Sequence, residues 1–176
     1  MTLSKQKNAL LIFGVIIAVL LLDFFTKWLA QAYIPYAGSH AASYPYGGIA
    51  IADNLLGIQI AIIHNINRGA AWGILSQWQE YLLYFRILLI GGLVVFVIRN
   101  KNISWDVPLA LIIGGAIGNV LDYFLYGHVI DMLQIVFWGY DYPTFNVADA
   151  AIFIGIASLL VKTWKEKKAN ITLHPS

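Results

Sequence analysis

A few kinds of polar side chain recur at short spacings in a chain in which only 11% of the residues are charged. They are Asp23 and Lys27, Asn119 and Asp122, the single Asp131, and Asn146 and Asp149. Two carboxylates that lie close together cannot easily both ionise, so they share one proton. One of them can then act as a base toward water while the other acts as an acid. This is aspartic hydrolase chemistry, and it requires a fold that brings two of these acids together.

The surrounding sequence indicates a membrane protein. Of its 176 residues, 60% are hydrophobic, and the mean hydropathy is +0.72. The length suits a single integral membrane domain that covers residues 1–176. The sequence has no cysteine, which excludes disulfides, thiolate nucleophiles and cysteine-bound metals. Its histidines lack the HExxH spacing, so we expect neither a metal nor a cofactor, and the chemistry must come from oxygen and nitrogen groups.

Four apolar stretches are long enough to cross a bilayer, which requires about 20 mostly apolar residues in a helix. They are residues 9–30, 81–98, 106–125 and 147–164. The sequence therefore predicts an all-α membrane fold with four spans. An even number of spans places both termini on the same side of the membrane.

Basic residues are unevenly distributed along the chain. Most lie on the tails or in the short loop between the second and third spans: Lys5, Lys7, Arg99, Lys101, Lys162, Lys165, Lys167 and Lys168. By the positive-inside rule this side is cytoplasmic, so we expect both termini in the cytoplasm and residues 34–76 and 126–146 outside. The end KTWKEKKAN marks the membrane surface, and no nucleic-acid partner is expected.

The first span has an alternative interpretation as a cleavable secretory signal. Lys5 and Lys7 precede its apolar run, and the small residues of AQA at 30–32 imitate a cleavage site. However, Asp23 and Lys27 interrupt the stretch where such a signal should be uncharged. We therefore expect this span to be retained.

The two external segments carry different patterns. Residues 34–76 begin with the loop-like IPYAGSHAASYPYGG, and β-branched runs then flank a turn-like Asp53-Asn54 and Gly57. This predicts a small external hairpin or sheet. Within residues 126–146, VIDMLQIVFW is compatible with an interfacial amphipathic segment, and GYDYP is a turn.

This topology brings the polar residues to one depth. The first and third spans run outward and carry their polar pairs near their outer ends, while the fourth span runs inward and carries Asn146 and Asp149 in its first turn. Asp131 lies in the external segment that joins the last two spans. Ionisable groups in spans are costly and usually face the bundle interior with a partner. The sequence thus predicts one polar site near the outer face.

Structural roles would also account for several of these residues. Asn146 and Asp149 fit a variant of the capping box at a helix start. Asp23 and Lys27, at i and i+4, fit an ion pair within one helix. Asp131 fits a turn after YGHV.

Two further residues have the same ambiguity. Asn119 could join helices beside the small residues Gly114 and Gly118, and Arg86 could snorkel or pair within the bundle. At the level of function, the competing class is a small transporter or scaffold whose acids relay protons or bind a cation. That class predicts broken helices and acids spread through the bilayer.

Four sequence blocks resemble the signature blocks of lipoprotein signal peptidase (signal peptidase II), in the order of that family. They are DFFTK at 23–27, NRGAAWG at 67–73, GNVLDYFLYGHVIDM at 118–132 and FNVADAAI at 145–152. The resemblance implies an aspartyl endopeptidase of the bacterial inner membrane with its active site near the outer face. It implies cleavage of lipid-modified prolipoproteins just before the diacylglyceryl-modified cysteine, with membrane lipid as the other partner.

The resemblance also implies roles for individual residues. Asp131 and Asp149 match the catalytic dyad, and substrate-binding or supporting roles fall to Asn67, Gly69, Ala70, Asn119, Asn146, Asp23, Lys27 and Asp122. The family fold is a four-helix membrane bundle with a small external β-sheet cradle, in agreement with the hairpin expected above.

The sequence departs from the family pattern at several positions. Tyr123 stands where Arg is usual, Phe24 where Gln is usual, and Trp72 and Met132 where Phe is common. Residues 36–48 look like an insertion. The missing Arg removes a cation expected near the dyad or the substrate, and Arg68 and Arg86 are the candidates to replace it.

Overall fold

Four long helices dominate the computed structural model, which describes residues 3–37, 47–99 and 105–173. The helices are α1 (Leu3–Tyr33), α2 (Gln79–Arg99), α3 (Asp106–Tyr126) and α4 (Val147–Leu173). Each contains a stretch that is long and apolar enough to cross a membrane, and these stretches are Ala9–Tyr33, Ser76–Arg99, Asp106–Tyr126 and Val147–Ala169. The predicted four spans are therefore confirmed.

The third helix lies at the centre of the bundle. It packs against α1, α2 and α4, and most of its apolar stretch is buried, whereas those of the other helices are largely exposed, as expected of surfaces that face lipid. Glycines on α3 permit this packing. A Cβ atom at Gly115 would overlap the carbonyl oxygen of Ala148 in α4, and one at Gly114 would lie 3.2 Å from Cβ of Val19 in α1.

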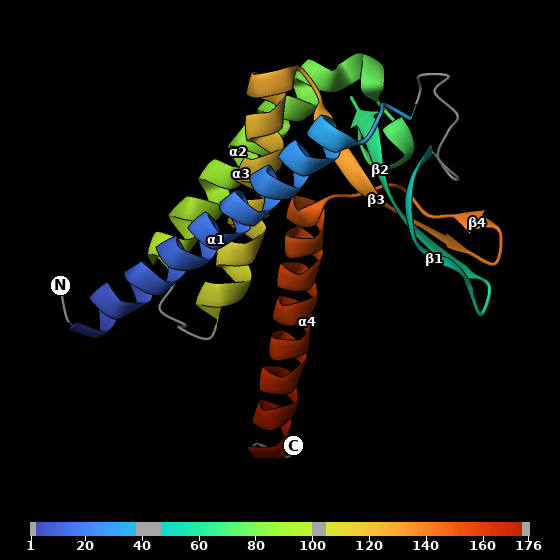
Figure 1. Cartoon of the computed structure of the whole chain (residues 1–176). Coiled ribbons are helices and arrows are strands. Elements are labelled where there is room, and N and C mark those ends of the chain that lie inside the picture. The colour runs from blue at the N-terminus through green and yellow to red at the C-terminus, as the bar shows by residue number, and fades with distance from the viewer. Residues whose placement is uncertain (1–2, 38–46, 100–104, 174–176) are drawn as a thin grey trace.

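A small antiparallel sheet lies at the end of the bundle away from both termini (Figure 1). Its strands are β1 (Gly48–Leu55), β2 (Ile58–Asn67), β3 (Val129–Phe137) and β4 (Tyr140–Asp141), in the order β1-β2-β3-β4. The predicted hairpin is confirmed as β1 and β2. Its turn is at Leu56 and Gly57, whereas Asp53 and Asn54, expected in the turn, belong to β1. The Asn54 side chain accepts a hydrogen bond from the Gly57 N–H.

The expected interfacial amphipathic segment is instead strand β3. Strand β3 pairs with β2 over nearly its whole length. This pairing satisfies the backbone hydrogen-bonding groups that a separate extended segment would leave without partners. The strand follows α3 directly, because Gly127 ends that helix in a left-handed conformation (φ 73°) with its N–H bonded to the Tyr123 carbonyl. The expected insertion at 36–48 lies mostly outside the described residues.

Candidate active site

A buried ion cluster joins α1 to α3. The Nζ atom of Lys27 lies 2.5 Å from Oδ2 of Asp23 and 2.7 Å from Oδ2 of Asp122. It also donates to Oδ1 of Asn119 at 3.2 Å. The Lys27 and Asp23 side chains are almost inaccessible, at 1% and 2% exposed. The expected pair of Asp23 with Lys27 within α1 is therefore present, and it is extended to α3.

The two carboxylates of this cluster also bind main-chain groups next to the candidate dyad. Oδ1 of Asp23 accepts the N–H of Ala148 at 2.8 Å, and Oδ2 of Asp122 accepts the N–H of Ile130 at 3.3 Å. Ala148 precedes Asp149 and Ile130 precedes Asp131 in the sequence. The ion cluster thus fixes the backbone immediately before each of these acids.

Asp131 lies in β3 and is only 1% exposed. Its Oδ2 accepts a hydrogen bond from Nδ2 of Asn67 and its Oδ1 accepts one from Nδ2 of Asn146, both at 2.9 Å. Burial, reinforced by the negative charge of Asp149, raises the pKa of Asp131 to about 7, although both amide hydrogen bonds act in the opposite direction. Asp131 can therefore hold a proton near neutral pH.

Asp149 lies in the first turn of α4 and is half-buried. Its Oδ1 accepts from Nδ2 of Asn119 at 2.7 Å, and its Oδ2 accepts from the backbone N–H of Asn146 at 3.3 Å. The Asp149 N–H in turn donates to Oδ1 of Asn146 at 2.9 Å. The capping interaction expected as a structural alternative is thus present, and it orients the carboxylate without closing it off from the cavity.

Two asparagines separate the ion cluster from the candidate dyad. Asn146, which is fully buried, donates to Oδ1 of Asn119 at 3.0 Å as well as to Asp131. Oδ1 of Asn119 also accepts from Lys27, while its Nδ2 donates to Asp149. Amide groups therefore connect the two sets of carboxylates in one continuous network, which leaves the dyad acids held by neutral donors.

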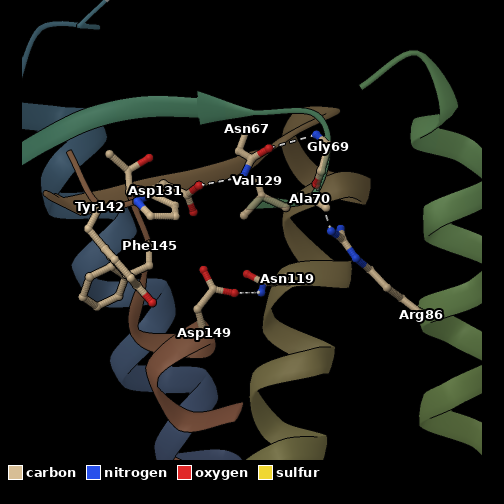
Figure 2. A pocket seen from close by; sticks show the side chains of 12 residues that line it. Asn67, Gly69, Ala70, Arg86, Asn119, Val129, Asp131, Tyr142, Phe145 and Asp149 are labelled. Atoms are coloured by element: carbon tan, nitrogen blue, oxygen red, sulfur yellow. Dashed lines mark hydrogen bonds between the residues drawn. The ribbon is translucent and has the colours of Figure 1, made fainter. Parts of the chain in front are cut away.

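The two acids face a common cavity of about 210 Å³ at the junction of the sheet and the helix ends. Figure 2 shows Asp131 approaching it from the strand and Asp149 from the start of α4. Within the described residues, neither acid forms an ion pair. The cavity is lined by Asn67, Gly69, Ala70, Arg86, Asn119, Val129, Asp131, Tyr142, Pro143, Thr144, Phe145 and Asp149.

The structure brings together the ten residues to which the family resemblance assigned roles. Asn67, Gly69, Ala70 and Asn119 line the cavity with the two acids. The remaining four residues, Asn146, Asp23, Lys27 and Asp122, lie buried behind it. The polar site expected at one end of the bundle is therefore formed.

Part of the cavity wall comes from residues whose role was not evident in the sequence. Tyr142 lies in the predicted turn GYDYP and Thr144 directly follows it, whereas Phe145 begins the block FNVADAAI but was given no role. Of the two cations considered as replacements for the missing Arg, Arg86 lines this cavity, whereas the exposed Arg68 lines a neighbouring one of about 380 Å³. A lone cation in an apolar span was the available signal for Arg86.

Fold and site together define a multi-pass membrane protein with a cavity lined by acids and amides at one end of its bundle. Residues 15–165 match the family model described as Signal peptidase (SPase) II. The chain belongs to the signal peptidase II family, a family of bacterial membrane peptidases.

Individual relatives agree with this assignment. The chain is 34% identical over 165 residues to a lipoprotein signal peptidase of Anoxybacillus flavithermus, with 92% of this chain and 90% of the relative covered. It is 36% identical over 148 residues to the one from Geobacillus kaustophilus, with 82% and 86% covered. A bacterial membrane enzyme solved at 2.3 Å resolution matches with a TM-score of 0.72 and 27% identity, over 89% of this chain and 88% of the other. The family resemblance and the fold it implied are thus confirmed.

Proposed function

We propose that this protein is an aspartyl endopeptidase that removes signal peptides from diacylglyceryl-modified prolipoproteins by cleaving before the lipidated cysteine. The observation that carries the proposal is that Asp131 and Asp149 approach one cavity from two different elements, each held by amides. Family membership supplies the class of substrate. Asn67, Gly69, Ala70 and the buried residues behind them then support the dyad.

The reaction follows from the different environments of the two acids. Asp131 carries the shared proton, because its pKa of about 7 keeps much of it protonated near neutral pH. Asp149, at the positive end of a helix and with two donors on its oxygens, acts as the base. It takes a proton from water as the water oxygen attacks the scissile carbonyl carbon, whose oxygen accepts the proton of Asp131.

Collapse of the resulting tetrahedral species completes the cycle. The carbon–nitrogen bond breaks, Asp149 returns its proton to the leaving nitrogen, and Asp131 regains the proton that it lent to the carbonyl oxygen. The two products are the signal peptide, with a free carboxyl end, and the mature lipoprotein, with a free amino group on its modified cysteine. Neither step needs a metal or a cofactor, since water and two carboxyl groups supply every atom and proton.

The position of the cavity suits a substrate that is partly in lipid. In our proposal the single domain has both termini in the cytoplasm, because Lys and Arg concentrate there, and the sheet end faces outward. The acyl chains would lie in the bilayer beside exposed apolar side chains of α2 such as Phe85 and Leu88. The peptide bond would then rest at the outer interface, beside Asp131 and Asp149.

The test is cleavage of a synthetic diacylglyceryl-modified peptide by the purified protein in detergent, with the products identified by mass spectrometry. We expect a cut immediately before the modified cysteine, and no cut in the same peptide without lipid. Cleavage at another bond, or equal cleavage of the unmodified peptide, would contradict the proposal. The transporter alternative predicts broken helices, whereas the described parts of the four spans are continuous.

A further inference from the structure

Arg86 is a cation within an apolar helix. The other charged residues of α2, Glu80 and Arg99, lie at its two ends, whereas Arg86 lies within it and is half-buried. A guanidinium group inside a membrane span is costly, so it usually has a defined partner. In the described part of the chain Arg86 forms no ion pair; its Nη2 atom donates to the carbonyl oxygen of Gly69 at 3.1 Å.

The bond to Gly69 is the first of a series that ends on Asp131. The N–H of Gly69 donates to Oδ1 of Asn67 at 2.9 Å, and Nδ2 of Asn67 donates to Oδ2 of Asp131 at 2.9 Å. Figure 2 shows these bonds as one line across the top of the cavity, from α2 to the carboxyl group. The carbonyl group of Gly69 is thus held by Arg86, while the N–H of the same residue holds the Asn67 side chain.

The segment that Arg86 contacts, residues 69–75, is a tight turn with a strained backbone. The Ala70 N–H donates to the Ile74 carbonyl at 2.7 Å, and a Cβ atom at Gly69 would overlap that same carbonyl oxygen. Trp72 and Leu75 have left-handed conformations, with φ of 54° and 62°. Such conformations persist only where surrounding contacts impose them. A donor on the regular helix α2 is a suitable external constraint for this segment.

We propose that Arg86 is a positioning residue for cleavage: through Gly69 it fixes the Asn67 amide, which in turn fixes the carboxyl group of Asp131 toward the cavity. This inference rests on the proposed function. It assigns to Arg86 a role that acts through other residues, without contact with the substrate. It also gives a reason for the presence of a cation within an apolar span that is otherwise largely exposed.

The first test compares Arg86→Gln, Arg86→Lys and Asn67→Ala in cleavage of the lipid-modified peptide. The Gln amide ends two atoms short of the position of Nη2 in Arg, so Arg86→Gln loses the bond to the Gly69 carbonyl as well as the charge. Loss of one charge-assisted hydrogen bond corresponds to about a tenfold effect, so this variant should lower kcat about tenfold and leave KM within about twofold. Arg86→Lys keeps a donor for Gly69 and should recover most of the activity. Because both residues act in one series, adding Arg86→Gln to Asn67→Ala should cost less than about a further twofold.

A second measurement does not depend on turnover. The Asn67 hydrogen bond lowers the pKa of Asp131, so its loss should move this pKa upward. The carboxyl infrared band that disappears in Asp131→Asn reports the titration. Both Arg86→Gln and Asn67→Ala should shift it upward, and the double variant should shift it no further than Asn67→Ala alone.

The control is Arg99→Gln, which removes a cation from the far end of α2 and should leave kcat and the titration unchanged. Additive effects in the double variant would overturn the inference, because they would indicate an independent electrostatic effect of the Arg86 charge. A raised KM with unchanged kcat would overturn it as well, because it would indicate direct contact with the substrate. Normal cleavage by Asp131→Asn would instead refute the proposed function. The infrared titration would still decide whether Arg86 controls the Asp131 carboxyl group.

Discussion

Two sets of carboxylates lie side by side in this protein and have opposite surroundings. Asp23 and Asp122 are both bonded to one lysine, Lys27, in a cluster almost closed to solvent. Asp131 and Asp149 have no cation within bonding distance among the described residues and face a cavity. The same side chain is thus used in one place to bind a buried lysine and in the other to line an open cavity.

The comparison shows how one set supports the other. The carboxylates around Lys27 accept the backbone N–H groups of Ala148 and Ile130, which directly precede Asp149 and Asp131. The ion cluster around Lys27, which we call the closed set, therefore acts as a frame that sets the positions of two chain segments from different parts of the sequence. Asp131 and Asp149, which we call the open set because they face the cavity, are held by amide donors. These donors orient the carboxylate oxygens without adding a charge.

Neutralising either acid of the open set should have the largest effect. Asp131→Asn or Asp149→Asn keeps the size and most hydrogen bonds but removes the titrating oxygen, so cleavage should fall by about a thousandfold or more. The double variant should be scarcely worse than either single one, because the acids act as a unit. Turnover of the lipid-modified peptide measures both. Near-normal turnover by Asp149→Asn would reduce Asp149 to a capping residue.

Removing the cation from the closed set should mainly affect stability. Lys27→Met leaves two buried carboxylates without their partner, which typically costs about 3–5 kcal/mol. We expect a markedly lower unfolding temperature in detergent, while Lys165→Met on the exposed end of α4 should change little. Adding Asp23→Asn and Asp122→Asn should restore much of the stability. Unchanged stability of Lys27→Met would show that the cluster does not frame the site.

The pH dependence of cleavage should report the proton of the open set. The pKa of Asp131 is raised to about 7, so this acid is protonated below and ionised above that pH. If cleavage needs its proton, kcat/KM should fall as the pH rises through about 7, approaching tenfold for each further pH unit. A pH–rate profile measures this limb. A profile that stays flat from pH 6 to 9 would contradict the role of Asp131 as the acid.

The same raised pKa has a consequence for stability. Between the ordinary value of 3.8 and about 7, the folded protein binds more protons at Asp131 than the unfolded chain does. This contribution is present at low pH and is lost as the pH rises through about 7. The unfolding temperature of Asp131→Asn, measured as its difference from that of the unmodified protein, should therefore be higher at pH 8 than at pH 4. An equal difference at both pH values would contradict the shift.

The close contact of α3 and α4 offers the mildest way to disturb the frame. Gly115→Ala would place a Cβ atom against the Ala148 carbonyl oxygen, and backbone cannot easily move aside. We expect cleavage to fall severalfold as the start of α4 shifts relative to Asp131. Gly91→Ala, with nothing within 4 Å of its added carbon, is the matched control and should be neutral or slightly stabilising. Equal behaviour of the two variants would argue against such a shift.

Much of this fold could be predicted from the sequence, because the length and hydropathy of each span can be read directly from the residues. The common depth of the acids followed from the direction of each span. The particular hydrogen-bond partners of these acids could not be predicted, since they depend on helix rotation and strand register. For example, a bulge in β2 between Ile62 and Asn65 sets Asp131 opposite Asn65 and Val129 opposite Asn67. No local pattern specifies that offset.

The contacts of Arg86 show the same limit. Its presence in an apolar span was evident, but its partner is a backbone carbonyl in a strained turn, and such a partner leaves no side-chain pattern to find. The strand nature of residues 129–137 was missed because that strand depends on a partner far away in the chain.

The location of Asp23 and Lys27 on a single helix has a consequence for biosynthesis. Chains are made from the N-terminus, so α1 enters the membrane before α3 and α4 exist. Because the ammonium lies one helical turn from the carboxylate, the two charges can neutralise each other during this interval. Asp122 and the N–H of Ala148 join them only as the later helices arrive. In the proposed mechanism the site is therefore incomplete until α4, which carries Asp149, is in place.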